Sequence, residues 1–270
     1  MVLNSSPIIR GRNQLPLAGT PAGDQARDDF IAGLLALLGD TRALWLPNRG
    51  DTTATTGVSR EERTFTYDAD IASRISPQGS GIQVDFDGDN DEADTLDEAN
   101  LSFGDGTNDS PFSVLWVGNR DVDASAQTLI SKQNSATVDE WELHLNTSGH
   151  PQFDLIDTSV SAIIGREDQT DIGTAAVFLA ATYSGSTLVG GISIYKDAVV
   201  VDDNNSDATT GSYIAMEDTA ALMTIGARFS TPERFYNGKM FLAAVTAREL
   251  DAADLWAIKA LVNAFYGLSL

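Results

Sequence analysis

Apolar and polar residues alternate along most of the chain from Ala43 onward, in short runs separated by turn-forming residues. The alternation is clearest in GIQVDFDG, where Ile82, Val84 and Phe86 fall on one face of an extended segment and the polar residues on the other. Similar runs occupy residues 113–117, 128–132, 141–145, 151–156, 176–183, 191–201, 222–228 and 239–247. Many short strands with frequent turn signals are typical of a β-sandwich or barrel.

Two stretches in this series predict hairpin turns. In ISIYKDAVVV a strand leads into a tight turn at Lys196 and Asp197 and then back out. In RFYNGKM the pair Asn237 and Gly238 supplies the positive backbone angles that a two-residue hairpin needs.

Two other segments have helical periodicity. The first follows Asp24, which is placed to cap it, and stops at Gly39; the second covers residues 250–266, with Asp251 placed to cap it. The apolar face of the first helix consists of Phe30, Ile31, Leu34, Leu35 and Leu38. Because a helix of about 15 residues is marginal alone, this face must dock on the rest of the chain or on a neighbouring subunit.

The first 42 residues differ from the remainder in their pattern of apolar and polar positions. Residues 1–23 show neither helical nor strand periodicity and are interpreted as an extended arm, which stays ordered only when it is tied down. Arg10 and Arg12 precede any acidic residue, so the arm is locally positive and could lie across an acidic partner surface. We therefore divide the chain into a docking arm with an amphipathic helix, residues 1–42, and a sandwich with a C-terminal helix, residues 43–270.

The formal net charge is −22, and the whole excess lies in residues 43–270, because residues 1–42 contain four basic and four acidic residues. Such a body repels nucleic acid and anionic membranes. Without cysteine there is no disulfide, thiolate metal site or cysteine nucleophile. No segment approaches the roughly 18 apolar residues of a membrane span. We expect a soluble protein with neither nucleic acid nor membrane as a partner.

The order of the runs resembles a known family. FDGDND, PFSVLWV, TLISK, EWELHLNTSG, LAATYSG, ISIYKDAVVV, TIGAR and YNGKMFLAAVTARELDAADL follow one another as in the LamG-like jelly roll of the concanavalin A-like lectin/glucanase superfamily, across about residues 43–264. The resemblance implies an all-β fold, an antiparallel β-sandwich flanked by an N-terminal arm with a short helix and by a C-terminal helix. One departure is TDIGTAAVFLAATY, which lacks the family's usual Trp.

Catalytic chemistry is not expected. Glucanases of this superfamily carry two glutamates and an aspartate along one strand, and that set is missing here. Glu140, Glu142 and His144 share one face of a predicted strand, which we interpret as a solvated polar face. His144 and His150, the only histidines, flank the turn NTSG, which could bring them together or could explain both as polar turn residues. No nucleophile elbow or phosphate-binding loop occurs.

Calcium is the one metal that the sequence brings forward. Counted from Asp87, the helix-loop-helix calcium pattern places acids correctly up to Glu98, but Glu92 occupies the sixth position, where a glycine is needed. The resemblance still implies calcium at a sandwich loop, with Asp87, Asp89 and Asp91 as ligands. The alternative is a charged loop that keeps an exposed sheet edge from pairing.

Two functions follow from the resemblance. The first is a non-enzymatic structural or interaction protein of a phage virion, such as a capsid decoration or other head-associated protein; by analogy of fold, it is an oligomer whose arm binds capsid or other virion proteins. The second is an extracellular or cell-surface carbohydrate-binding module for adhesion or receptor binding, with or without calcium. Its glycan contacts would come from exposed aromatics among Trp45, Tyr183, Phe235 and Tyr236, although packing in the core or at a sheet edge is the favoured interpretation of each. We expect Trp116 and Trp141 to be buried within strands.

Overall fold

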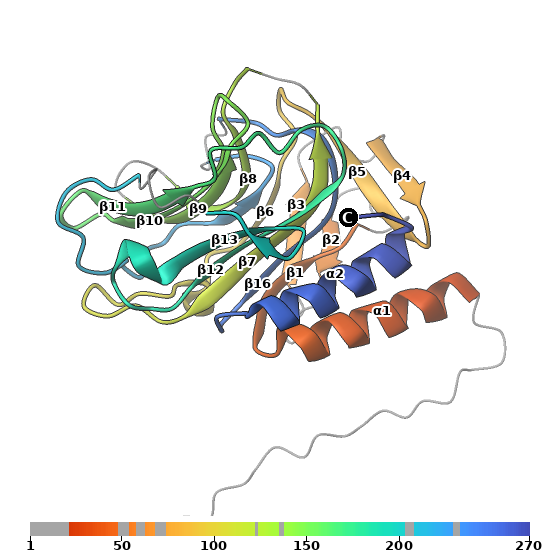
Figure 1. Cartoon of the computed structure of the whole chain (residues 1–270), viewed down its shortest axis with the longest axis horizontal. Helices are drawn as coiled ribbons and strands as arrows, with labels where there is room; N and C mark the ends of the chain where they lie inside the picture. The colour runs from red at the N-terminus through yellow and green to blue at the C-terminus, as the bar shows by residue number, and fades with distance from the viewer. Residues whose placement is uncertain are drawn as a thin grey trace, which may run out of the picture.

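The computed structural model describes residues 22–47, 54–57, 63–67, 74–121, 124–134, 138–202, 208–228 and 233–270. Two β-sheets pack face to face, and two helices lie side by side against the outer face of one sheet (Figure 1). The predicted all-β sandwich is confirmed. Within the described residues, no helix is long and apolar enough to cross a membrane.

The first sheet is antiparallel throughout. Its strands are β1 (Thr41–Trp45), β4 (Ile75–Gln78), β5 (Gly81–Asp87), β7 (Phe112–Arg120), β12 (Val177–Tyr183), β13 (Ile192–Lys196), β14 (Val199–Val200) and β16 (Asn237–Thr246). They follow the order β14-β13-β12-β7-β16-β5-β4, and β1 also pairs with β16.

The second sheet is also antiparallel and contains the remaining strands. They are β2 (Ala54–Gly57), β3 (Arg63–Tyr67), β6 (Ala93–Thr95), β8 (Gln127–Gln133), β9 (Asp139–Leu145), β10 (Pro151–Asp157), β11 (Ala162–Glu167) and β15 (Met223–Ile225). Their order is β11-β10-β9-β8-β15-β6-β3-β2. Two short 3-10 helices, Ala99–Leu101 and Val189–Gly191, lie in connections.

The main core fills the space between the sheets. Val84 and Phe86 of β5 are buried there, as the alternation in GIQVDFDG predicts, and Trp116 and Trp141 are fully buried. Burying a large apolar side chain contributes about 1.5–3 kcal/mol. The inward-facing residues therefore account for the choice of face in each strand.

A second core lies between the helices and the outer face of the first sheet. Helix α1 (Ala22–Leu38) buries Phe30, Leu34 and Leu38 against α2 (Ala252–Tyr266) and the sheet. The ring of Phe30 stacks on Phe265 with centroids 4.1 Å apart. Of the two predicted docking surfaces, the helix thus uses the body of its own chain.

The apolar face of α1, which the docking-arm hypothesis offered to a partner, is engaged within the chain. Ile31 and Leu35 are half-buried and pack against the same core cluster, so the five predicted apolar positions all serve contacts within the chain. Arg10 and Arg12 lie outside the described residues.

The helix ends agree only in part with the predicted caps. Helix α1 begins at Ala22, so Asp24 lies in its first turn and does not precede the helix. Asp251 caps α2 as predicted: its carboxylate accepts from the backbone N–H of Asp254 at 2.9 Å, and the Asp254 carboxylate accepts from the N–H of Asp251. Reciprocal bonds of this kind satisfy donors that the first helical turn leaves free.

Of the two predicted hairpin turns, the structure contains one. The β13–β14 turn is formed by Asp197 and Ala198, both with positive φ, one residue later than predicted. The prediction for Asn237 and Gly238 is wrong, because both residues belong to β16. A Cβ at Gly238 would lie 2.3 Å from the carbonyl oxygen of Asn119 on β7, so the glycine permits a close approach of two strands.

The acidic stretch from Asp87 to Glu98 connects the two sheets. Strand β5 ends at Asp87 in the first sheet, and β6 then pairs with β3 and β15 in the second. The sequence indicated only a loop here, because a three-residue strand is too short to show alternation.

Candidate functional site

A groove of about 370 Å³ opens on the outer face of the second sheet. It is bordered by β9, β10, β11 and the segments that flank β15 and β16. Its lining consists of Ala126, Glu142, His144, Asn146, Thr147, Gln152, Asp154, Ile156, Ile163, Arg228 and Arg234. Seven of these eleven side chains carry a carboxylate, an amide, an imidazole or a guanidinium group, so the groove is predominantly polar.

The strand period places the central residues of the groove. Trp141 and Leu143 of β9 enter the core, so Glu142 and His144 project from the opposite face. Across the β9–β10 pair, Asp154 lies opposite Glu142 and Gln152 lies opposite His144. Directly opposed residues in an antiparallel pair are close enough to interact, which explains why these side chains meet.

The prediction of a shared face is confirmed, but that of a solvated face is wrong. Glu142 is 2% exposed, His144 is 5% exposed and Glu140 is fully buried. Groups of this kind are rarely buried without partners, so their contacts decide the chemistry of the face.

Glu142 is held in its charged form. Its Oε1 accepts from the hydroxyl of Thr128 at 2.6 Å, and Arg228 Nε and Arg234 Nη1 each lie 3.7 Å from its Oε2. Burial alone would raise the pKa of Glu142. The nearby imidazole of His144, the guanidinium groups and the Thr128 hydrogen bond outweigh burial and hold this pKa below its ordinary value.

The pKa of Asp154 is shifted in the opposite direction. Burial raises the pKa of Asp154 to about 6, against the opposing influence of His144 and of the hydrogen bonds from Gln152. Gln152 Nε2 donates to both carboxylate oxygens of Asp154, at 2.9 and 3.0 Å. Asp154 leans over Gly165 of β11, where a Cβ would stand 2.0 Å from its Oδ1.

The two histidines have separate environments. His144 Nδ1 lies 3.6 Å from Glu142 Oε2 and 3.9 Å from Asp154 Oδ2, and within the described part of the chain it makes no hydrogen bond. His150 Nδ1 instead contacts Glu167 Oε1 at 2.8 Å. Each histidine thus has its own carboxylate neighbours, and they do not form a shared pair.

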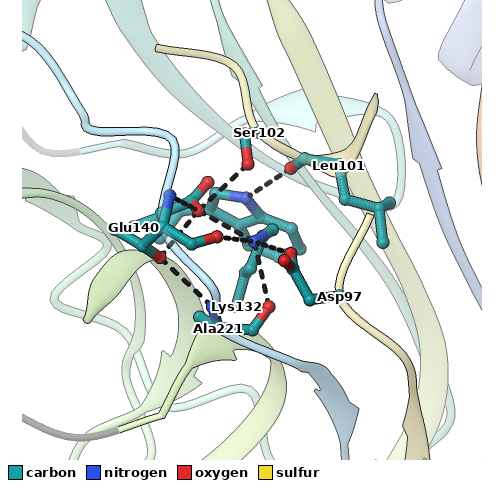
Figure 2. Close-up of polar contacts among 8 residues, drawn as sticks. Asp97, Leu101, Ser102, Lys132, Glu140 and Ala221 are labelled. Carbon is teal, nitrogen blue, oxygen red and sulfur yellow. Dashed lines mark hydrogen bonds and ion pairs between the residues drawn. The ribbon is translucent and has the colours of Figure 1, made fainter. Parts of the chain in front are cut away.

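A second polar cluster joins β8 and β9 to the connections that carry Asp97, Ser102 and Ala221 (Figure 2). Lys132 Nζ of β8, which is fully buried, lies 2.8 Å from Glu140 Oε1 and 3.1 Å from Asp97 Oδ1, and it donates to the carbonyl of Ala221 at 2.9 Å. Glu140 Oε1 also accepts hydrogen bonds from the hydroxyl of Ser102 and from the backbone N–H and hydroxyl of Thr219. These contacts fasten two connections over the sheet, so Glu140 has a structural role.

The predicted calcium ligands are neutralised by an arginine. Arg74 Nη2 lies 2.7 Å from Asp87 Oδ2, and Arg74 Nε lies 3.5 Å from Asp91 Oδ2. Asp87 Oδ1 accepts from the backbone N–H of Asp89, and Asp91, which is 1% exposed, accepts from the N–H of Asp87. The side chain of Asp89 is exposed. A guanidinium thus occupies the position that the calcium hypothesis gave to the cation, and the structure gives that hypothesis no support.

The predicted glycan-contacting aromatics are mostly in the core. Trp45, Tyr183 and Tyr236 are fully buried, and Phe235 is half-buried. A fully buried ring offers no surface to a ligand, so the favoured interpretation, core packing, is confirmed for the first three, and the alternative of glycan contact is wrong for them. Trp256 of α2 is 52% exposed but was not singled out, because its helical position shows no recognition pattern.

No protein-family model matches the chain, and no curated protein matches it either. Solved structures do share its fold. A structure described as showing that cell entry of botulinum neurotoxin type C depends on two ganglioside molecules has a TM-score of 0.61 at 12% identity, over 84% of this chain and 53% of that one. The binding domain of Paraclostridial Mosquitocidal Protein 1 has a TM-score of 0.61 at 9% identity, over 83% and 52% of the two chains.

A third similar structure is the botulinum neurotoxin serotype D ligand-binding domain in complex with N-acetylneuraminic acid, with a TM-score of 0.60 at 9% identity, over 88% and 56% of the two chains. The chain therefore spans about half the length of each of these structures. At such identities the likeness establishes the fold alone, a β-sandwich of two antiparallel sheets. The narrower assignments to a LamG-like domain and to a phage particle stay predictions.

Proposed function

We propose that this protein is a carbohydrate-binding module and that the groove on the second sheet holds its ligand. The observation that carries the proposal is the density of hydrogen-bonding groups in the groove. Carboxylates accept, guanidinium groups donate, and amides do both, which matches the hydroxyl groups of a sugar.

The size and lining of the groove narrow the kind of ligand. Its volume of about 370 Å³ lies at the lower end of the range of roughly 300–1,000 Å³ for small-molecule sites. Among the described residues that line it there is no Phe, Tyr or Trp, so recognition would rest on hydrogen bonds rather than on stacking of a sugar on a large ring. A short, polar glycan segment fits both properties.

Similar solved structures add support of a general kind. Among them is a domain in complex with N-acetylneuraminic acid. Fold likeness does not assign a ligand, but it raises the expectation that this sandwich binds glycans.

We propose binding without hydrolysis. Glu142 and Asp154 are both nearly buried, and Thr128 and Gln152 hold them through hydrogen bonds. The strand set of three carboxylates found in related glucanases is absent from the sequence. Placement in a virion, and assembly through residues 1–42, stay predictions.

The experiment is a glycan array on the full chain, followed by calorimetry with the best binder. Arg234→Ala removes a donor from the groove, and we expect it to weaken binding at least about tenfold, the equivalent of about 1.4 kcal/mol. Arg42→Ala is the matched control, because its side chain is similarly exposed, 30% against 35%, but lies on β1. Equal affinities of the two variants, or no binder on the array, would refute the proposal.

A further inference from the structure

We infer that Glu142, His144 and Asp154 form a binding site for a divalent transition-metal ion of the zinc type. One ligand atom from each of the three residues lies within 4.8 Å of the other two. This inference does not depend on glycan binding, since it rests on the three side chains at the floor of the groove.

The distances suit a tetrahedral ion. Zinc binds imidazole nitrogen and carboxylate oxygen at about 2.0–2.2 Å, which places two ligands of a tetrahedron about 3.4 Å apart. His144 Nδ1 lies 3.6 Å from Glu142 Oε2 and 3.9 Å from Asp154 Oδ2. Both His144 separations are thus within about half an ångström of the tetrahedral spacing, and the two carboxylate ligand atoms lie within 4.8 Å of each other. These separations are also too long for hydrogen bonds between the ligands.

The unpartnered imidazole nitrogen of His144 is a second, independent observation that indicates a metal ligand. His144 is 5% exposed, and its buried Nδ1 has no hydrogen-bond partner among the described residues although it faces two carboxylates. A buried polar atom without a partner destabilises a fold unless something else satisfies it. A metal ion bound to Nδ1 would do so.

The surrounding residues fix the ligands as metal sites require. Thr128 donates to Glu142 Oε1, Gln133 Nε2 donates to Oε2 at 3.4 Å, and Gln152 donates to both oxygens of Asp154. Outer groups that orient the ligands in this way are a regular part of metal sites. Gly165 leaves the space in which Asp154 lies.

Two guanidinium groups near the proposed ligands oppose the binding of a cation. The two carboxylates together balance a divalent cation, but Arg228 and Arg234 stand 3.7 Å from Glu142 Oε2. Arg228 donates its Nε to Gln133 Oε1 at 2.6 Å and faces Glu233, so its own position does not require Glu142. Removing Arg234 should therefore tighten metal binding, whereas we expect it to weaken glycan binding.

A nitrogen ligand favours zinc over calcium, which takes oxygen ligands. The protein supplies three ligands, and the groove opens onto them, so a remaining position would take water. The structure thus assigns the metal to the groove and not to the acidic connection between the sheets.

The test uses Zn²⁺ alone with the full chain. The sequence contains two histidines, so imidazole nitrogen NMR resolves each of them. We expect the His144 signals to shift and saturate at one equivalent of Zn²⁺, with His150 unchanged, and we expect no such shift with Ca²⁺. Calorimetry should show at least tenfold weaker binding for His144→Gln, unchanged binding for the control His150→Gln, and tighter binding for Arg234→Ala.

Several results would overturn the inference. They are no binding at millimolar Zn²⁺, equal shifts of both histidines, or equal affinities of the two histidine variants. If His144→Gln fails to fold, the NMR titration of the unaltered chain decides alone. Because glycan affinity and metal affinity should change in opposite directions in Arg234→Ala, failure of one proposal is distinguishable from failure of the other.

Discussion

Removal of the buried ammonium of Lys132 should destabilise the protein strongly. In Lys132→Met the side chain keeps its approximate length, but Glu140 loses a counter-charge that lies 2.8 Å away while both residues are fully buried. Breaking a buried ion pair by removing one partner costs about 3–5 kcal/mol, because the other charge remains without compensation. The carbonyl oxygen of Ala221 also loses a donor. We therefore expect a loss at the upper end of this range.

The decisive comparison is with the double variant Lys132→Met/Glu140→Gln. A neutral glutamine can still accept from Ser102 and residue 219, but it needs no counter-charge. The double variant should thus be more stable than Lys132→Met alone, although it carries one substitution more.

Urea unfolding of the full chain, followed by tryptophan fluorescence, measures these differences. The control is Lys196→Met, which removes one hydrogen bond to a carbonyl at 3.3 Å from a half-buried lysine and should cost about 1 kcal/mol or less. The reasoning is refuted if Lys132→Met costs no more than this control, or if the second substitution lowers stability further.

Two further predictions concern the pH dependence of stability, and a third concerns the packing of helix α1. Burial raises the pKa of Asp91 from 3.8 to about 6, so its neutral form stabilises the fold below pH 3.8 and this contribution is lost as the pH rises to 6; Asp91→Asn should therefore gain up to about 3 kcal/mol at pH 7. Asp105 has the opposite effect on stability, since hydrogen bonds from backbone N–H groups lower its pKa, and Asp105→Asn should therefore be less stable than the unaltered protein above pH 3.8. Between pH 3.5 and pH 7, the urea midpoint of Asp91→Asn should rise and that of Asp105→Asn should fall, each relative to the unaltered protein. A difference that does not change in this direction contradicts the prediction for that variant. Phe30→Ala removes the ring stacked on α2 and should cost about 3–5 kcal/mol in urea unfolding, and a loss under 1 kcal/mol would show that α1 is not part of the core.

The fold was predictable from the sequence where the pattern is local. Alternation in runs such as GIQVDFDG identified strands, and Asp251 marked the start of α2. Local patterns do not state which sheet face covers which residue, so the sequence left glycan contact open as an alternative to core packing for Trp45 and Tyr183, which are fully buried. Short elements such as β6 left no periodic signal at all.

The candidate site was predictable only in part, because its residues meet through pairings between distant segments. Glu142 and His144 share a strand face that the sequence shows, whereas Asp154 joins them only through the register of β9 and β10. Likewise, Asp87 and Asp91 resemble calcium ligands until Arg74, from an earlier segment, is placed beside them. Charge patterns along one stretch cannot reveal such a neighbour.

The layering of the molecule gives it a front and a back. Helices α1 and α2 pack against the outer face of the first sheet. The groove opens on the outer face of the second sheet, on the opposite side of the sandwich, so among the described residues it is this sheet that offers its surface to a small ligand. The C-terminus emerges beside the helices (Figure 1). A fusion, a tag or a solid support joined there would therefore hold the protein with its groove directed outward, and an array of such copies would present every groove on the same side.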